Sequence, residues 1–219
     1  IKKLPSKHKI DIKNLKKIKI EDALIKILSS PNHSNKNWVT SQYDQMVMCD
    51  TVQKSGSDAA IIRIHNKDKA IAVSVDSSAN YCKSHPKSGG KQIVCENWRN
   101  LISVGAKPLA ITNCLNFGNP ENQEIMGEFA ECIEGIKEAC GFWKYPVVSW
   151  NLSFYNGTNK KNIYPTPVIG GVGLIKKLSK PLSHNFKKSN SAIILIGKTF
   201  GHIEQSCFLK ENYSIIEGM

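Results

Sequence analysis

The chain has 219 residues and a formal net charge of +12 at pH 7, and 41% of its residues are hydrophobic. That apolar share is ordinary for a globular protein with a sizeable core, and no apolar run reaches the length of a membrane span. Seven cysteines are scattered singly, without a CxxC pair. This spacing argues against a zinc site and a disulfide framework, and it predicts reduced thiols in the cytoplasm.

The positive charge lies on two flanking segments. Residues 1–20 carry eight Lys and one Asp, and residues 176–190 carry five Lys and no acidic residue. Arg63 and Arg99 are the only arginines, whereas proteins that read base sequence rely on arginine forks. We therefore favour solvated basic tails on a nearly neutral domain and expect no specific nucleic acid as a partner. A nucleic-acid surface is the alternative.

The first part of the chain predicts a linker, a short helix and a β-hairpin. Residues 1–35 are expected to hold a Lys-rich linker and then an amphipathic helix over 21–30, where apolar side chains recur with helical spacing. Residues 59–64 and 69–75 are rich in β-forming residues and are separated by turn residues, which is typical of a hairpin. Residues 76–90, dense in Ser, Pro, Gly and Lys, predict a long loop.

Helices and strands are expected to alternate through the rest of the chain. The pattern predicts helices over 91–104 and 121–140, and strands over 108–115, 146–154, 167–175 and 192–196. This order predicts an α/β (α+β) fold with one domain over 36–176. Residues 177–190 are expected to be a linker, and residues 191–219 the beginning of a second domain.

The stretch LNFGNPE (115–121) passes from a strand to a helix through a polar loop. Asn119 is a suitable N-cap, and Pro120 is a suitable first helical residue. Helix capping is therefore one interpretation. The other is an anion site, because Gly118 allows close backbone approach and free N–H groups at a helix start attract negative charge.

Strand alternation over 147–154 places Ser149, Asn151 and Ser153 on one face and Trp150 on the other. Three small polar side chains in a row are suited to contact a ligand or a metal-bound phosphate. A solvent-facing strand edge is the alternative interpretation.

Two further features are weaker signals of metal or phosphate binding. Asp76 follows a strand, where a carboxylate can approach hydrated Mg²⁺ or form an Asx turn. Residues 88–91 (SGGK) stand at an expected helix start but lack the spacing of a P-loop. No Ser/His/Asp order or positioned Cys/His pair predicts a nucleophile, so we assign no catalytic residue to the chain.

Several long stretches, in order, carry a family resemblance. They are WVTSQYDQMV (38–47), GSDAAIIRI (56–64), AIAVSVD (70–76), the run from GGK to NFGNPE (89–121), VVSWNLSFYNGT (147–158) and IYPTPVIGGVGLI (163–175). Over about residues 20–210 they resemble the second (C-terminal) half of the small-type PurL subunit of formylglycinamidine ribonucleotide (FGAM) synthase. The resemblance implies a PurM-like ATP-binding domain of the AIR synthetase superfamily, with a mixed sheet and flanking helices, followed by the start of a PurM-like C-terminal-type domain.

The resemblance also implies an activity. FGAM synthase is a ligase of purine biosynthesis that makes FGAM from formylglycinamide ribonucleotide, ATP and glutamine-derived ammonia. The implied partners are the first-half PurL-like domains or subunit, an ammonia-supplying glutaminase subunit and the ribonucleotide, with ATP and Mg²⁺ as cofactors. The family's catalytic histidines belong to the first half, and the chain begins at Ile1 without Met. We therefore expect a split or excised piece that is inactive alone.

Four binding residues follow from the resemblance. Asn113, where the family usually has Asp, and Trp150, where it has Gly, stand at ATP. Asn151 stands at Mg²⁺, and Ser153 stands at the ribonucleotide. Asn113 lacks the carboxylate charge, and we expect the Trp150 indole to fill an adjacent core or to cover the gap that the nucleotide needs. Two alternatives are a degenerate half that serves as a structural or assembly module, and another ATP-using member of the superfamily.

Overall fold

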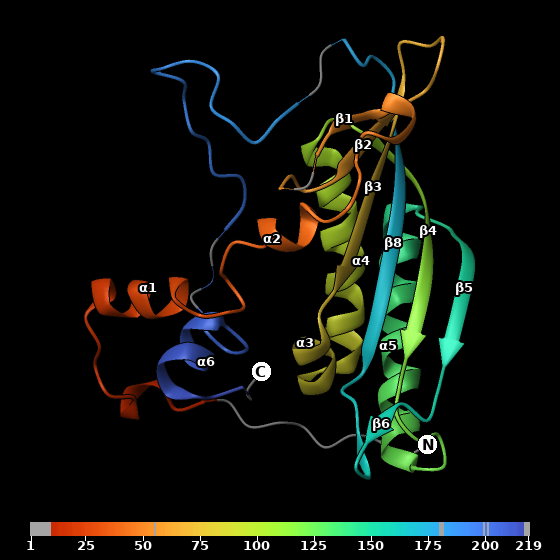
Figure 1. Ribbon diagram of the computed structural model, residues 1–219. Coiled ribbons are helices and arrows are strands. Elements are labelled where there is room, and N and C mark those ends of the chain that lie inside the picture. The colour runs from red at the N-terminus through yellow and green to blue at the C-terminus, as the bar shows by residue number, and fades with distance from the viewer. Residues whose placement is uncertain (1–9, 55, 180–181, 199, 201, 217–219) are drawn as a thin grey trace.

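A six-stranded mixed sheet with helices on one face forms the body of the computed structural model, which describes residues 10–54, 56–179, 182–198, 200 and 202–216 (Figure 1). The strand order is β1-β2-β3-β8-β4-β5. The strands are β1 (Thr51–Gln53), β2 (Ala60–Arg63), β3 (Ala70–Ser77), β4 (Lys107–Asn116), β5 (Val147–Ser153) and β8 (Thr166–Ile175). The expected α/β architecture with a mixed sheet and flanking helices is confirmed.

Two long helices, α4 (Pro86–Ser103) and α5 (Gln123–Trp143), cover one face of this sheet (Figure 1). The opposite face carries no helix in the described part of the chain. The shorter elements are α1 (Ile20–Leu28), α2 (Asn37–Thr40), α3 (Ala79–Ser84), α6 (Cys207–Tyr213), the 3₁₀ turns Ile12–Asn14 and Val47–Cys49, and a ribbon of β6 (Gly157–Thr158) and β7 (Lys161–Asn162). Helix α6 packs against α1, so the two ends of the described chain lie side by side.

The strand directions bring three carboxyl ends together. Strands β3 and β4 both run antiparallel to β8, and β4 runs parallel to β5. The carboxyl ends of β3, β4 and β5 therefore lie at one edge of the sheet. Loops that follow strand ends are frequent ligand sites in α/β proteins, and Asp76, the LNFG loop and the polar end of β5 all lie at this edge.

The core lies between the sheet and the two long helices. Leu101 of α4, Ile111 of β4 and Ile169 of β8 are almost completely buried, and each such side chain stabilises the fold by roughly 1.5–3 kcal/mol relative to an exposed one. Trp98 of α4 stacks on Trp143 of α5 with ring centroids 4.1 Å apart. These contacts hold the helix layer against the sheet.

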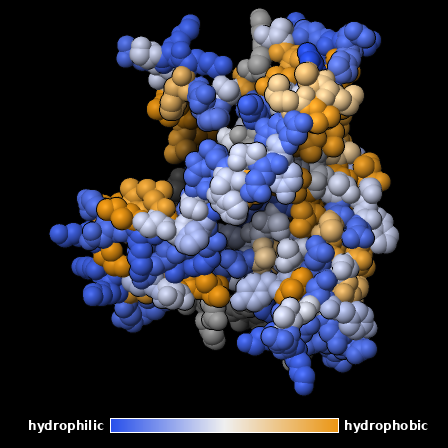
Figure 2. Space-filling view, viewed as in Figure 1, coloured by the Kyte–Doolittle hydropathy of each residue, from blue (hydrophilic) through white to orange (hydrophobic). Residues whose placement is uncertain are grey.

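The expected hairpin and first helix are confirmed. Strands β2 and β3 pair antiparallel, with Ala60 opposite Val73, and Asn66 in their turn has a φ of 58°, which Asn tolerates better than most residues. Apolar side chains of α1 reach the surface (Figure 2), where Ile25 is 64% and Leu28 62% exposed. Residues 1–9 of the expected linker lie outside the described residues.

The expected loop over 76–90 is wrong. Asp76 and Ser77 complete β3, and most of the remaining residues belong to α3 and the first turn of α4. His85 caps α4, because its Nδ1 accepts a hydrogen bond from the Ser88 N–H at 3.2 Å, and Pro86 takes the first helical position. The SGGK stretch therefore lies inside a helix and is not a phosphate loop.

The glycines of this stretch are explained by helix packing. A Cβ on Gly90 of α4 would overlap the Cys132 carbonyl of α5, and a Cβ on Gly135 of α5 would overlap the Lys87 carbonyl of α4. Two helix backbones can approach this closely only where side chains are absent. Tertiary packing thus overrides the low helix propensity of glycine.

The expected strand over 192–196 is also wrong. These residues have no strand partner in the described part of the chain, and Ile194 and Ile196 are 78% and 92% exposed. A strand is stabilised by contacts with its neighbours in a sheet, and neither side of this segment has one within the described ranges. The limits expected for the first domain, the linker and the second domain stay predictions.

Ion pairs also join helices α3 and α4 to helix α5. Lys87 and Lys91 of α4 both bind the Glu138 carboxylate of α5, with Lys87 Nζ 2.5 Å from Glu138 Oε1. Lys83 of α3 reaches Glu128, which is only 4% exposed, at the same distance of 2.5 Å. The hydrogen bond from Lys87, followed by that from Lys91, lowers the pKa of Glu138 to about 2.

Replacing this carboxylate should have a pH-dependent cost. We expect Glu138→Gln to lower the free energy of unfolding at neutral pH and to change it little near pH 2. Because the folded-state pKa lies below the ordinary value of 4.5, the ionised group stabilises the fold above that value and loses its effect as pH falls toward about 2. Urea unfolding from neutral to strongly acidic pH measures the difference.

A matched control is Glu134→Gln, which removes one exposed pair with Lys137 at 3.5 Å within a single helix. Such a pair contributes little, so this variant should unfold like the parent at every pH. An equal loss for Glu138→Gln at neutral and acidic pH would contradict the prediction.

Candidate functional site

One row of neighbouring residues crosses the sheet near the carboxyl ends of the strands. Asp76 of β3 and Asn113 of β4 both pair with Ile169 of β8. Asn113 in turn pairs with Trp150 of β5. Paired neighbours project their side chains to the same face of a sheet. Because Ile169 is fully buried under the helices, Asp76, Asn113 and Trp150 belong to the helix-covered face.

Asn151 and Ser153 lie on the opposite face. Their partners on β4 are Cys114 and Asn116, and Asn151 Nδ2 lies 3.6 Å from Cys114 Sγ. The predicted alternation along β5 is confirmed. The structure therefore brings Asn113 together with Trp150, and Asn151 together with Ser153, and it places the sheet between these two pairs. A single ligand can contact both pairs only around the carboxyl ends of β4 and β5.

The side chain of Asn113 has an unusual environment. The residue is 7% exposed, and its Oδ1 is buried without a hydrogen-bond partner among the described residues. A buried polar atom without a partner costs roughly 1–3 kcal/mol, and such atoms are uncommon in folded proteins. An unpaired acceptor at the carboxyl end of a strand is therefore a candidate ligand contact.

The Trp150 indole is 69% exposed. The expectation that it could fill an adjacent core is wrong, because β5 is an edge strand with no strand beyond it in the described chain. Leu152 and Phe154 are the residues of this face that pack against the core. The expectation that the indole covers a nucleotide gap stays a prediction.

The LNFG loop is capped by side chains, although not as predicted. Helix α5 begins at Gln123, and the cap is Asn122, whose Oδ1 accepts a hydrogen bond from the Glu124 N–H at 2.8 Å. Asn119, the expected cap, instead accepts from the Glu121 N–H at 2.9 Å in an Asx turn. These two bonds satisfy N–H groups that an anion would need, so the loop supports the capping interpretation.

Gly118 makes room for a protein side chain. A Cβ on Gly118 would lie 2.6 Å from Asn162 Oδ1, and that oxygen accepts a hydrogen bond from the Asn119 N–H at 2.9 Å. The β6–β7 ribbon thus fastens the LNFG loop through Asn162. Sequence reasoning missed this residue, and Asn159 in the two-residue turn Asn159-Lys160 of the ribbon, where both residues have positive φ, is the signal that could have indicated it.

Asn156 orients the end of β5. Its Nδ2 donates to the Phe117 carbonyl at 3.0 Å and to Ser153 Oγ at 3.1 Å. The expected substrate contact Ser153 is therefore held in place by its neighbour in the YNGT stretch. Asn156 was also missed, because its partners become visible only when β4 and β5 lie side by side.

A buried polar network surrounds Asp76. Its carboxylate accepts hydrogen bonds from Asn97 Nδ2 at 2.9 Å and Asn100 Nδ2 at 2.7 Å, both on α4, and from Ser74 Oγ at 2.6 Å. Tyr145 donates to Asn97 Oδ1 at 2.8 Å, and burial raises the pKa of Tyr145. Asp76 therefore forms no Asx turn. The sequence signal for this network was Asn97, a polar residue on the apolar stripe of α4, and the structure buries it completely.

The described residues contain no group of three His, Cys, Asp or Glu side chains that could hold a metal ion. A hydrated Mg²⁺ can be held by fewer protein ligands when phosphate oxygens and water complete its shell. Within the same residues, no helix has the length and apolar character needed to cross a membrane.

Known proteins share this arrangement. A family model described as AIR synthase related protein, N-terminal domain, matches residues 56–175. The chain belongs to the AIR synthase related family. The match runs from just before β2 to the last residue of β8, so the AIR synthase related domain includes the whole row of strand-end residues.

Relatives of this AIR synthase related chain are PurL subunits. The phosphoribosylformylglycinamidine synthase subunit PurL of Pelagibacter ubique is 56% identical over 209 residues, which are 95% of this chain and 29% of that protein. The chain thus spans less than a third of the relative's length. The resemblance to PurL seen in the sequence is confirmed, whereas the correspondence to its second half stays a prediction.

Solved structures agree with the sequence relatives. The structure of PurLQS from Thermotoga maritima has a TM-score of 0.63 and 36% identity, covering 68% of this chain and 25% of that one. T. maritima PurL complexed with ATP has a TM-score of 0.58 and 37% identity, covering 65% of this chain and 23% of that one. The AIR synthase related domain of this chain therefore has the fold of a domain found in PurL.

Proposed function

We propose that the chain is part of FGAM synthase, corresponds to the second half of a small-type PurL subunit, and supplies contacts to ATP, Mg²⁺ and formylglycinamide ribonucleotide. The observation that carries the proposal is the 56% identity to a PurL subunit over 95% of the chain. The similarity to a PurL structure that holds ATP supports ATP as the nucleotide ligand. In this proposal the chain acts in the cytoplasm as one part of a purine-biosynthetic ligase.

Asn113 is the proposed nucleotide contact. Its buried and unpaired Oδ1 fits a hydrogen-bond donor on the nucleotide, which would satisfy that atom. Trp150 is the adjacent residue on β5 and shares its face of the sheet. The indole adds bulk where a glycine would leave the backbone accessible, so it is proposed to restrict the nucleotide rather than to bind it.

Asn151 and Ser153 are the proposed metal and substrate contacts. The Asn151 side chain is exposed on the open face and offers one amide oxygen. Because the described residues form no carboxylate cluster, the other Mg²⁺ ligands would be phosphate oxygens and water. Ser153 is held by Asn156, which supports a fixed direction for its hydroxyl group toward the ribonucleotide.

The proposal is tested by reconstitution. We expect no FGAM from the isolated chain supplied with ribonucleotide, Mg-ATP and ammonia, because no general base or nucleophile is assigned to it. FGAM should form when a first-half PurL chain is added, and glutamine should replace ammonia once a glutaminase subunit is present. Turnover by the isolated chain would overturn the assignment.

A degenerate, non-catalytic half is the second candidate function. It is favoured by Asn113 and by the exposed Trp150, both of which depart from the family pattern. Ser153→Ala in the reconstituted complex separates the two functions. A loss of about tenfold or more in kcat/KM, equivalent to one lost contact of roughly 1.4 kcal/mol, supports a binding role. Unchanged turnover supports a structural module.

A further inference from the structure

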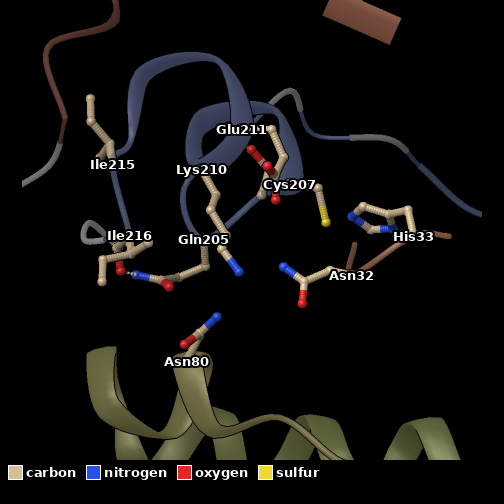
Figure 3. A pocket seen from close by; sticks show the side chains of 10 residues that line it. Asn32, His33, Asn80, Gln205, Cys207, Lys210, Glu211, Ile215 and Ile216 are labelled. Carbon is tan, nitrogen blue, oxygen red and sulfur yellow. Dashed lines mark hydrogen bonds between the residues drawn. The ribbon is translucent and has the colours of Figure 1, made fainter. Parts of the chain in front are cut away.

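A cavity of about 250 Å³ lies where three distant parts of the chain meet. Asn32 and His33 come from the turn after α1, and Asn80 comes from α3. The third wall is α6 with the residues on either side of it, which include Lys210 and Glu211 (Figure 3). This cavity has no residue in common with the row that contains Asn113.

Hydrogen-bond donors from all three parts converge on the cavity. Figure 3 shows the side-chain nitrogen atoms of Asn32, Asn80 and Lys210 directed toward its centre. None of these three side chains forms a hydrogen bond or an ion pair with another described residue. A lysine ammonium group offers three hydrogen-bond donors that need acceptors, and here two amide groups from other segments face the same space. Such a convergence suits an anionic group.

The cavity also contains one acceptor that requires a donor. Glu211 lines it, and the Oε1 atom of Glu211 is buried without a hydrogen-bond partner among the described residues. A carboxylate repels a bare anion but accepts a hydrogen bond from a hydroxyl group. Ile215 and Ile216 add an apolar wall. The ligand that satisfies these groups has an anionic end and a hydroxyl-bearing end.

Size restricts the ligand further. Pockets for drug-sized molecules usually enclose about 300–1,000 Å³, and this one encloses about 250 Å³. A ring-sized polyol with one phosphate is compatible with that space, and the His33 imidazole is the one aromatic ring among the lining residues.

We propose that this cavity is a binding site for a small sugar phosphate, in which Lys210, Asn80 and Asn32 hold the phosphate group and Glu211 accepts a sugar hydroxyl. The site is separate from the strand-end site because the two share no residue, and its test does not depend on the proposed activity, although the proposed ribonucleotide substrate also contains a ribose phosphate.

A cysteine in the lining of the cavity can report ligand binding. Cys207 lines it, and both Cys207 and Cys49 are exposed thiols, with Cys49 outside the lining. The full chain is alkylated with iodoacetamide, and the two cysteine peptides are followed by mass spectrometry. With ribose 5-phosphate at ten times its Kd, Cys207 should react about tenfold more slowly, because about one tenth of the sites remain free. The rate at Cys49 should not change.

Ligand controls separate the two ends of the molecule. Ribose lacks the phosphate and inorganic phosphate lacks the hydroxyls, so each should protect Cys207 at least several-fold less well than ribose 5-phosphate at equal concentration. Glu211→Gln should reduce the difference between the protection of Cys207 by ribose 5-phosphate and its protection by inorganic phosphate. The proposal would be overturned if ribose protected Cys207 as well as ribose 5-phosphate does, or if ribose 5-phosphate protected Cys49 as well as Cys207.

Protein controls complete the test. Lys210→Met should abolish the protection, and Lys187→Met, which removes the same charge from an exposed position outside the cavity, should keep it. Asn80→Ala serves as a second variant if Lys210→Met fails to fold, as judged by its Tm, since Asn80 is exposed on α3 and should weaken protection with little effect on folding. Full protection in both cavity variants would exclude the proposal.

Discussion

Gly135→Ala should lower the free energy of unfolding by about 2–3 kcal/mol, a cost within the range of overpacked cores. The new methyl group would overlap the Lys87 carbonyl of α4, and this neighbour is backbone. It cannot rotate away as a side chain would, so the two helices must separate. The separation weakens contacts along the whole α4–α5 interface, including the Lys87–Glu138 ion pair. A thermal melt should show a lower Tm by about 5–10 °C for a chain of this size.

The same helix offers the matched control. Gly141 also lies in α5, and a Cβ there would meet no atom within 4 Å. Gly141→Ala should therefore stabilise the fold by about 0.5–1 kcal/mol, because alanine loses less backbone entropy than glycine in a helix. Opposite signs for the two substitutions test the packing itself. Equal effects would show that helix propensity, and not the α4 contact, determines the outcome at Gly135.

Trp150→Gly combined with Asn113→Asp should raise the affinity for Mg-ATP by at least about tenfold, since a hydrogen bond to a charged group contributes roughly 1.5–3 kcal/mol. The two residues are direct neighbours on β5 and β4. Removing the indole exposes the β5 backbone, and the carboxylate restores the charge that the family usually has at this position. Titration calorimetry on the chain assembled with its partner chains measures the change.

Two controls accompany this variant. Val148→Gly alters β5 on the same face, where Val148 is 70% exposed, and it should leave Mg-ATP affinity unchanged. The Tm of both variants should be measured by thermal melting. Asn113 is 7% exposed, so a carboxylate at this position carries a burial penalty in the absence of the nucleotide. Tight Mg-ATP binding by the unaltered protein would show that the indole leaves the nucleotide site open.

The division of the strand-end residues between two faces limits how a ligand can lie. Asn113 and Trp150 share the helix-covered face, and Asn151 and Ser153 share the open face. A nucleotide and a ribonucleotide on opposite sides of the sheet would therefore meet only beyond the ends of β4 and β5. The chain spans less than a third of the length of its PurL relative.

Local patterns in the sequence determined most of the longer elements. The hairpin of β2 and β3, the apolar stripe of α5 and the alternation along β5 were all predicted, because each depends on residues close together in the chain. The alternation also predicted correctly that Trp150 turns away from Asn151 and Ser153. These residues occupy one strand, and the pleat alone decides their directions.

Contacts between distant residues were decided only by the tertiary structure. Gly89 and Gly90, which contributed to the prediction of a loop over 76–90, lie in a helix that packs against α3 at Gly89 and α5 at Gly90. The strand expected over 192–196 has no neighbour among the described residues with which to pair. The unpaired Oδ1 of Asn113 and the cavity around Lys210 also depend on contacts between residues that are far apart in the sequence. Whether a buried atom lacks a partner, and whether three segments enclose a cavity, is decided only when the chain packs. The local spacing of residues in the sequence does not predict that packing.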